Sequence, residues 1–232
     1  MNGSSSVLSA MIVAGLCFPV SADVLLDQPH DFRYGPRSEW LWNHISPQRG
    51  DDYQPAGRVI VESVTFWMVA TWAHAPDDWA FSVHRSTDES SFWEFAPEYP
   101  WFFERTGPSE VVDLGRWNDE ADRHLYEVRF DDLDLSLDPA DTEKGVFWFS
   151  AFGHITNANT QFAGWGTSGN GDINGWYAWW KTMPWIAPGW AGFTLPDGSF
   201  TDLAMRIEGT PVPVPGAVIP FAMLALRRRR GR

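Results

Sequence analysis

Residues 58–69 read Arg-Val-Ile-Val-Glu-Ser-Val-Thr-Phe-Trp-Met-Val, and this stretch decides the fold class. It is rich in β-branched and aromatic residues and lacks helical periodicity, which together predict the longest strand of the protein. Strict alternation predicts two faces, with Val59, Val61, Ser63, Thr65 and Trp67 on one and Ile60, Glu62, Val64, Phe66 and Met68 on the other.

Further strand patterns lie on either side of this stretch, separated by turn signals at 75–78, 106–108 and 195–198. Such short strands at regular spacing predict an all-β protein with a single antiparallel β-sandwich of jelly-roll type over residues 23–210, between a flexible N-terminal signal and a flexible C-terminal tail. The predicted segments are 79–84, 91–95, 110–114, 125–130, 133–137, 146–152, 175–180 and 202–208.

The body at 23–210 is acidic and contains no cysteine. It holds all 30 acidic residues and 12 of the 17 Lys and Arg, so its net charge is −18. That charge repels phosphate backbones, which argues against nucleic-acid binding. The single cysteine, Cys17, lies before the body, so the 15 Trp and 16 Phe must supply stability by packing rather than by disulfides.

The N-terminus has the layout of a secretory signal. Polar residues 1–6 precede an uncharged apolar run at 7–20, and Val20-Ser21-Ala22 has the small residues that a signal peptidase requires. We expect export, with cleavage after Ala22. The alternative is that this run forms a buried first strand or helix.

The C-terminal segment at 211–232 is ordered like a membrane-retained tail. The prolines at 211, 213 and 215 predict a stiff extended spacer. An apolar run at 216–226 follows, and then the basic residues Arg227, Arg228, Arg229 and Arg230, with Arg232 at the end. Cations after an apolar run are expected to stay on the cytoplasmic side.

This tail resembles the PEP-CTERM sorting signal, with Val212, Pro213, Val214 and Pro215 as its motif and Val where Glu is commonest. The resemblance implies processing by an exosortase in a Gram-negative bacterium that makes extracellular polysaccharide, and a place in the cell envelope, at the surface or outside the cell. Segments 51–53, 61–67 and 145–150 also resemble secreted domains that precede such tails, without catalytic residues to carry over. The alternative is a basic tail with no sorting role.

Two motif matches in the body lie in one loop. Residues 164–169 spell GxGxxG, but the helix-hostile run that follows excludes a dinucleotide site. Asn170, Asp172 and Asn174 resemble the start of a calcium loop, although Lys181 stands where a bidentate Glu belongs. We therefore expect an Asx-rich turn and no defined metal ligands, while Ca²⁺ binding elsewhere on the acidic body stays open. The scattered histidines do not suit zinc.

The aromatic segment at 176–185 is the candidate ligand surface. An exposed row of Trp and Tyr could stack on sugar rings, and the alternative is that these rings are packing. No GxSxG or HExxH motif occurs, so we expect no catalysis, with a jelly-roll glycan-degrading enzyme as the weakest alternative. The candidate carbohydrate-binding residues are Trp176, Tyr177, Trp179, Trp180 and Trp185.

The expected protein is therefore an exported, non-catalytic β-sandwich of the cell envelope or extracellular matrix, associated with secreted polysaccharide. The runner-up is a carbohydrate-binding module that uses the aromatic segment. We expect a monomer whose terminal segments alone contact the membrane, with signal peptidase and an exosortase as processing partners.

Overall fold

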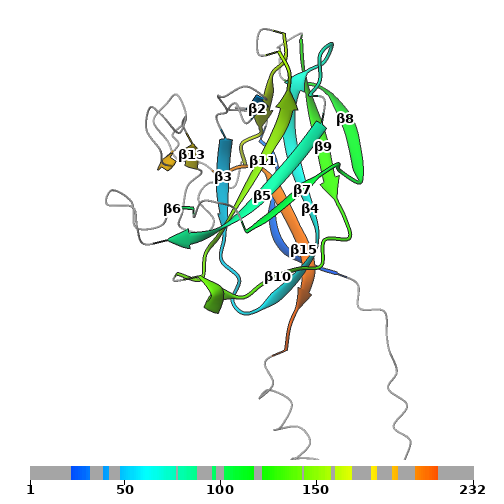
Figure 1. The fold of residues 1–232 in the computed structure, drawn as a ribbon. Coiled ribbons are helices and arrows are strands. Elements are labelled where there is room, and N and C mark those ends of the chain that lie inside the picture. The colour runs from blue at the N-terminus through cyan, green and yellow to red at the C-terminus, as the bar shows by residue number, and fades with distance from the viewer. Residues whose placement is uncertain are drawn as a thin grey trace, which may run out of the picture.

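A computed structural model shows an all-β protein in which two antiparallel sheets pack face to face (Figure 1). This confirms the predicted single β-sandwich. The jelly-roll strand order stays a prediction. The structure describes residues 22–31, 39–41, 48–76, 78–87, 96–97, 102–117, 122–142, 144–157, 160–168, 179–181, 190–192 and 202–213.

The first sheet is centred on the long strand β4 (Val59–Thr71). On one side of β4 lie β15 (Met205–Pro211) and then β1 (Asp23–Gln28), and on the other lie β9 (Arg123–Phe130) and β8 (Glu110–Arg116). Two short strands also pair with β4, namely β10 (Leu135–Leu137) and β12 (Ala163–Trp165).

The second sheet is centred on β11 (Phe147–Ile155), which pairs with β5 (Asp78–Thr87) and β3 (Gln48–Tyr53). Its remaining strands are short, and β2 is the one that runs parallel to β11. They are β2 (Glu39–Leu41), β6 (Ala96–Pro97), β7 (Phe103–Thr106), β13 (Trp179–Lys181) and β14 (Trp190–Gly192).

The described residues hold one 3₁₀ turn, Pro139–Asp141, capped by the Asp138 carboxylate, which accepts a hydrogen bond from the Ala140 amide at 3.0 Å. None of the described segments forms a helix long and apolar enough to cross a membrane.

A β-bulge in β4 corrects the predicted alternation of its faces. Opposite β15, the partner of Ser63 is Glu208 and that of Val61 is Gly209, so Glu62 is an extra residue in the strand. Beyond the bulge, the residues that face the core are those that strict alternation from Val59 would place on the opposite face. As a result, the residues of β4 in the core are Val59, Val61, Val64, Phe66, Met68 and Ala70.

The core between the sheets is aromatic, as the composition predicts. The Phe66 ring lies 5.4 Å from that of Phe81 in the opposite sheet and 5.2 Å from that of Trp165, with all three side chains fully buried. Phe130 joins them, its ring centroid 4.8 Å from that of Phe81. Large flat side chains in contact bury much apolar area each, which suits a body without disulfides.

Most predicted strands are present, with boundaries shifted by a few residues. Strands β4, β5, β8, β9, β10, β11 and β15 fall on predicted segments, and β13 overlaps the end of the one at 175–180. Sequence reasoning missed seven described strands that are short or lack clear alternation, namely β1, β2, β3, β6, β7, β12 and β14. The predicted strand at 91–95 and turn at 195–198 lie outside the described residues.

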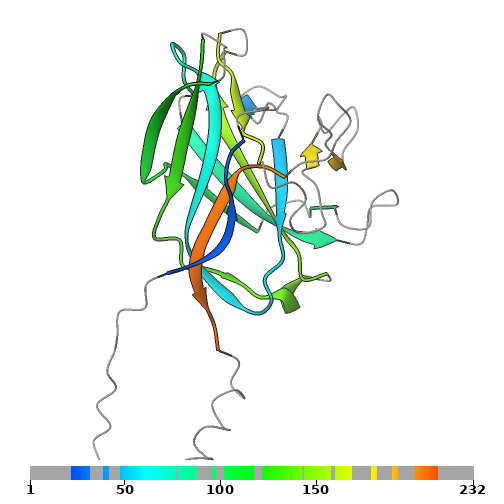
Figure 2. The same ribbon diagram turned by 180° about the vertical axis from the view of Figure 1, so that it is seen from behind.

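Both ends of the body leave from the same end of the sandwich (Figures 1 and 2). Strands β1 and β15 are antiparallel neighbours, with Asp23 opposite Gly209. Ala22 directly precedes β1, and Val212 directly follows β15, with its amide donating to the carbonyl of Arg58 at 2.8 Å. The strands nearest the two ends of the body are therefore neighbours on one side of the first sheet, with β1 at the edge.

Replacement of Gly209 tests the bulged pairing of β4 with β15. A Cβ atom at this position would collide with the carbonyl oxygen of Ile60, which belongs to the backbone and cannot rotate away. We expect Gly209→Ala to lower the free energy of unfolding by about 2 kcal/mol or more. Gly57→Ala is the matched control, because open space surrounds that position, and should change it by less than about 0.5 kcal/mol. Urea unfolding measures both, and equal effects would contradict the register.

Candidate functional site

The structure places part of the predicted aromatic segment in the second sheet, one strand in from its edge. Strand β13 pairs with β3, so that Trp179 lies opposite Gly50 and Trp180 opposite Arg49, and β14 continues the sheet beyond it. Trp176, Tyr177 and Trp185 lie outside the described residues, as do Val214, Pro215 and Arg227–Arg230. Stacking of sugars on these rings therefore stays a prediction.

The strand next to β13 carries a buried pair of acids that sequence reasoning did not single out. Asp51 and Asp52 are both fully buried on β3, which sits between β13 and β11. Asp51 lies opposite Phe149 in the ladder with β11, and Tyr53, two residues along β3, belongs to the core. Asp51 therefore lies on the core face of the sheet, where an apolar residue would be the usual choice.

Asp51 links the two sheets through its carboxylate. Its Oδ2 accepts a hydrogen bond from the Leu203 amide at 2.5 Å, and its Oδ1 accepts one from the Asp52 amide at 3.0 Å. Leu203 lies just before β15, so this contact joins β3 of one sheet to the segment that leads into the other. Breaking these hydrogen bonds inside a protein is costly, because it leaves buried polar groups without partners.

The electrostatics around Asp51 oppose its ionisation. Complete burial raises its pKa well above the usual value, and the nearby carboxylates of Asp202 and Asp52 raise it further, although the two amide bonds act in the opposite direction. Asp202 is also fully buried. Asp51 therefore favours a bound proton, and its contact with the segment before β15 becomes sensitive to pH.

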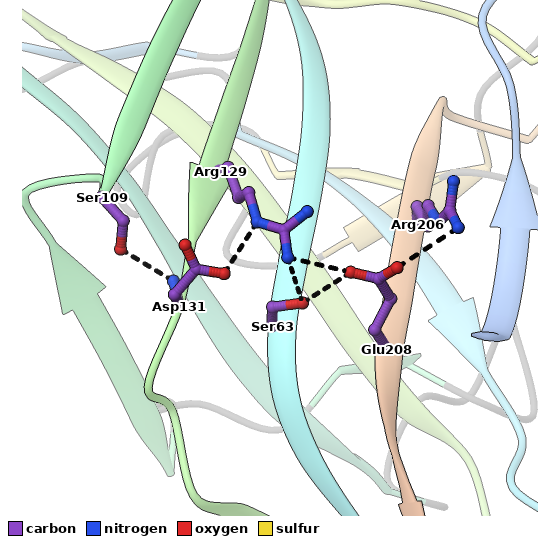
Figure 3. Close-up of polar contacts among 6 residues, drawn as sticks. All are labelled: Ser63, Ser109, Arg129, Asp131, Arg206 and Glu208. Atoms are coloured by element: carbon purple, nitrogen blue, oxygen red, sulfur yellow. Dashed lines mark hydrogen bonds and ion pairs between the residues drawn. The ribbon is translucent and has the colours of Figure 1, made fainter. Parts of the chain in front are cut away.

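A second polar group crosses the outer face of the first sheet (Figure 3). The Arg129 guanidinium on β9 contacts Asp131 at 2.7 Å and Glu208 on β15 at 3.1 Å. Ser63 on β4 donates to the same Glu208 oxygen at 2.9 Å, and Arg206 contacts the other oxygen at 3.2 Å. These contacts tie three neighbouring strands together, so we interpret the group as a structural network rather than a site.

A shallow cleft of about 440 Å³ is lined by Ile60, Glu62, Asp132, Leu133 and Asp134. Its three carboxylates make it the place where a glycan-degrading reaction would be sought. Glu62 already accepts a hydrogen bond from the Thr210 hydroxyl at 2.6 Å. Among the described residues, no three His, Cys, Asp or Glu side chains are arranged to hold a metal ion, and Ca²⁺ binding stays a prediction.

One pair of residues has the composition of a nucleophile and its base. Ser82 Oγ and His84 Nε2 lie 3.0 Å apart on β5. Both side chains are buried, at 1% and 0% exposure, so a substrate has no access to the hydroxyl in this arrangement. The pair is better explained as a structural contact, in which each buried polar side chain gives the other a hydrogen-bond partner.

Within the glycine motif at 164–169, the described residue Gly166 has a packing role. Gly166 follows β12, and its amide donates to the carbonyl of Trp67 on β4 at 2.7 Å. A Cβ atom at this position would lie 3.0 Å from the same oxygen, which leaves little room for a side chain. Thr167 and Ser168 then continue into isolated β-bridges, with Leu203 and His30 as their respective partners, rather than into a helix.

Comparison with models of protein families, with curated proteins and with solved structures found no match for this chain. The sorting-signal resemblance and the assignment to the cell envelope therefore rest on the sequence.

The buried acids predict an unusual dependence of stability on pH. The native state binds the Asp51 proton more tightly than the unfolded chain does, so stability falls as pH rises from the unfolded pKa, about 3.9, towards the native one. We expect Asp51→Asn to weaken this slope in urea unfolding measured between pH 5 and pH 7. Asp134→Asn, an exposed position, is the control and should leave the slope unchanged. A slope equal to that of the native chain in Asp51→Asn would contradict the assignment.

Proposed function

We propose that the protein is an exported, non-catalytic β-sandwich of a Gram-negative cell envelope that associates with secreted polysaccharide. The observation that carries this proposal is the arrangement of the two ends. The predicted cleavage site at Ala22 directly precedes β1, and the proline spacer begins at the last residue of β15, Pro211. Loss of the signal and of the tail beyond the spacer therefore removes none of the strands that the structure describes.

The arrangement also suits a protein held at one end. Because β1 and β15 are adjacent and antiparallel, the tail leaves the body beside its N-terminus (Figure 2). A stiff proline spacer at that point would hold the body away from the membrane surface. The acidic surface disfavours direct contact with anionic lipids, so the terminal segments are the proposed membrane contacts.

A carbohydrate-binding module built on the aromatic segment is the second candidate. It is favoured by the position of β13, which places Trp179 and Trp180 between the edge strand β14 and the acidic strand β3. Polysaccharide association is common to both candidates, and they differ in whether the 176–185 segment makes the contact.

Processing in the native host tests the proposed role in the envelope. We expect the mature protein to begin at Asp23 and to lack the arginine cluster, so its intact mass should be lower than that of the full chain at both ends. The measurement is mass spectrometry of the protein recovered from membrane, periplasmic and extracellular fractions. A chain truncated after Pro215 is the matched control and should leave the membrane fraction. A mature species that still carries Arg232 would exclude exosortase sorting while leaving export intact.

A further inference from the structure

An exposed tryptophan stands at the tip of the central strand. Trp72 directly follows β4, its side chain is 61% exposed, and its amide donates to the carbonyl of Asp122 at 2.8 Å. Its ring stacks on that of His124, with centroids 5.6 Å apart and an angle of 23° between the planes. The contact supports one side of the indole, and the exposure leaves most of the ring open to solvent.

A row of aromatic rings connects Trp72 to the core. His124 lies 6.4 Å from Tyr126, and Tyr126 lies 6.1 Å from Trp79, between ring centroids. Tyr126 and Trp79 are buried at 8% and 6% exposure. The exposed ring therefore rests on a packed support. A ring that is already positioned loses less conformational entropy when it binds a ligand than a mobile one.

A carboxylate is fixed beside the same rings. His124 Nδ1 lies 2.8 Å from Asp113 Oδ2 on the edge strand β8, and the side chain of Asp113 is 40% exposed. Asp113 Oδ1 also accepts from the Gly115 amide at 2.7 Å, across a bulge in β8 where Gly115 has a φ of 97°. The bulge and the histidine together hold the carboxylate in one place while leaving it accessible to a ligand.

These groups match the two surfaces of an uncharged sugar. A pyranose ring has an apolar C–H face, which gains from covering an exposed indole, and equatorial hydroxyls, which can donate to a carboxylate at the ring edge. The charge of −18 on the body disfavours a polyanion. A protein partner fits less well, since the centres of protein interfaces are depleted in acidic residues such as Asp113.

The position of Trp72 suits contact with a polymer outside the cell. Val59, at the other end of β4, pairs with Pro211, where the tail leaves the body. Thirteen residues of strand separate these two points, a length of roughly 40 Å. A protein held by its tail would therefore present the Trp72 end of β4 away from the tail.

We propose that Trp72, Asp113 and His124 form a contact site for an uncharged sugar unit of a polysaccharide. The proposal rests on the polysaccharide association proposed above and names the residues and the ligand class. Trp72 supplies the stacking surface, Asp113 accepts hydrogen bonds from sugar hydroxyls, and His124 positions both. This site shares no residue with the aromatic segment at 176–185.

Affinity electrophoresis of the full chain tests the site. The gels contain a neutral β-glucan, a mannan or a galactan, and an alginate gel supplies the anionic comparison. We expect at least one neutral polymer to retard the native protein and alginate not to do so. Trp72→Ala should weaken that retardation by roughly tenfold, and Trp72→Phe by less, because it keeps an aromatic face. Asp113→Asn should weaken it severalfold.

Val24→Ala is the matched control, because Val24 is 48% exposed and lies on β1, at the end where the tail leaves. It should bind like the native protein, and thermal unfolding confirms that each variant is folded. Binding by Trp72→Ala equal to that of the native chain would overturn this site and leave polysaccharide association standing. Retardation by alginate that depends on Trp72 would overturn the ligand class. Silence of the native chain on every polymer would overturn both proposals. An effect of Trp72→Ala on self-association alone, with retardation unchanged, would overturn the site only.

Discussion

The fold depends on the bulge in β4. A strand that pairs with four others in one sheet must turn a continuous apolar face to the opposite sheet, and strict alternation of this sequence would instead divide its apolar residues between core and solvent. One additional residue, Glu62, brings Val61 and Val64 to the same face. Phe66 then meets Phe81 across the interface, and the aromatic core forms around that contact.

The same residue connects the core to the surface. Since Glu62 is the extra residue, its side chain is free to line the cleft with Asp132 and Asp134 and to accept the hydrogen bond from Thr210. Next to it, Ser63 reaches Glu208 in the network that joins three strands. The bulge therefore sets both the packing inside the sheet and the polar contacts on its outer face.

The sequence predicts the long and strongly patterned elements well, because their β-branched and aromatic content is decisive on its own. It does not predict β3, whose Gly50-Asp51-Asp52 run contradicts strand propensity and is stabilised by tertiary contacts such as that of Asp51 with the Leu203 amide. The faces of β4 were predicted wrongly because a bulge has no reliable local signal and is fixed by the register with β15.

The residues of the proposed contact site also could not be identified from the sequence alone. Trp72 is one of 15 tryptophans, and its sequence neighbours do not distinguish it from those that pack in the core. Trp72 differs from them in its position, because it directly follows the end of β4 and its ring stacks on His124 of β9. A sequence pattern can give the aromatic content of a surface, but the exposure of each ring depends on contacts between distant strands.

The pairing of the first strand with the last has a consequence for the order of folding. Asp23 and Gly209 are opposite one another although 186 residues separate them along the chain. If the chain crosses a membrane N-terminus first, β1 emerges early and has to wait for β15 before its edge is covered. Closing so long a loop is slow, and an unpaired strand edge is prone to aggregation in the interval. On that route the first sheet could be completed only after nearly the whole body had crossed, so the unpaired edge of β1 would be exposed for most of the transfer.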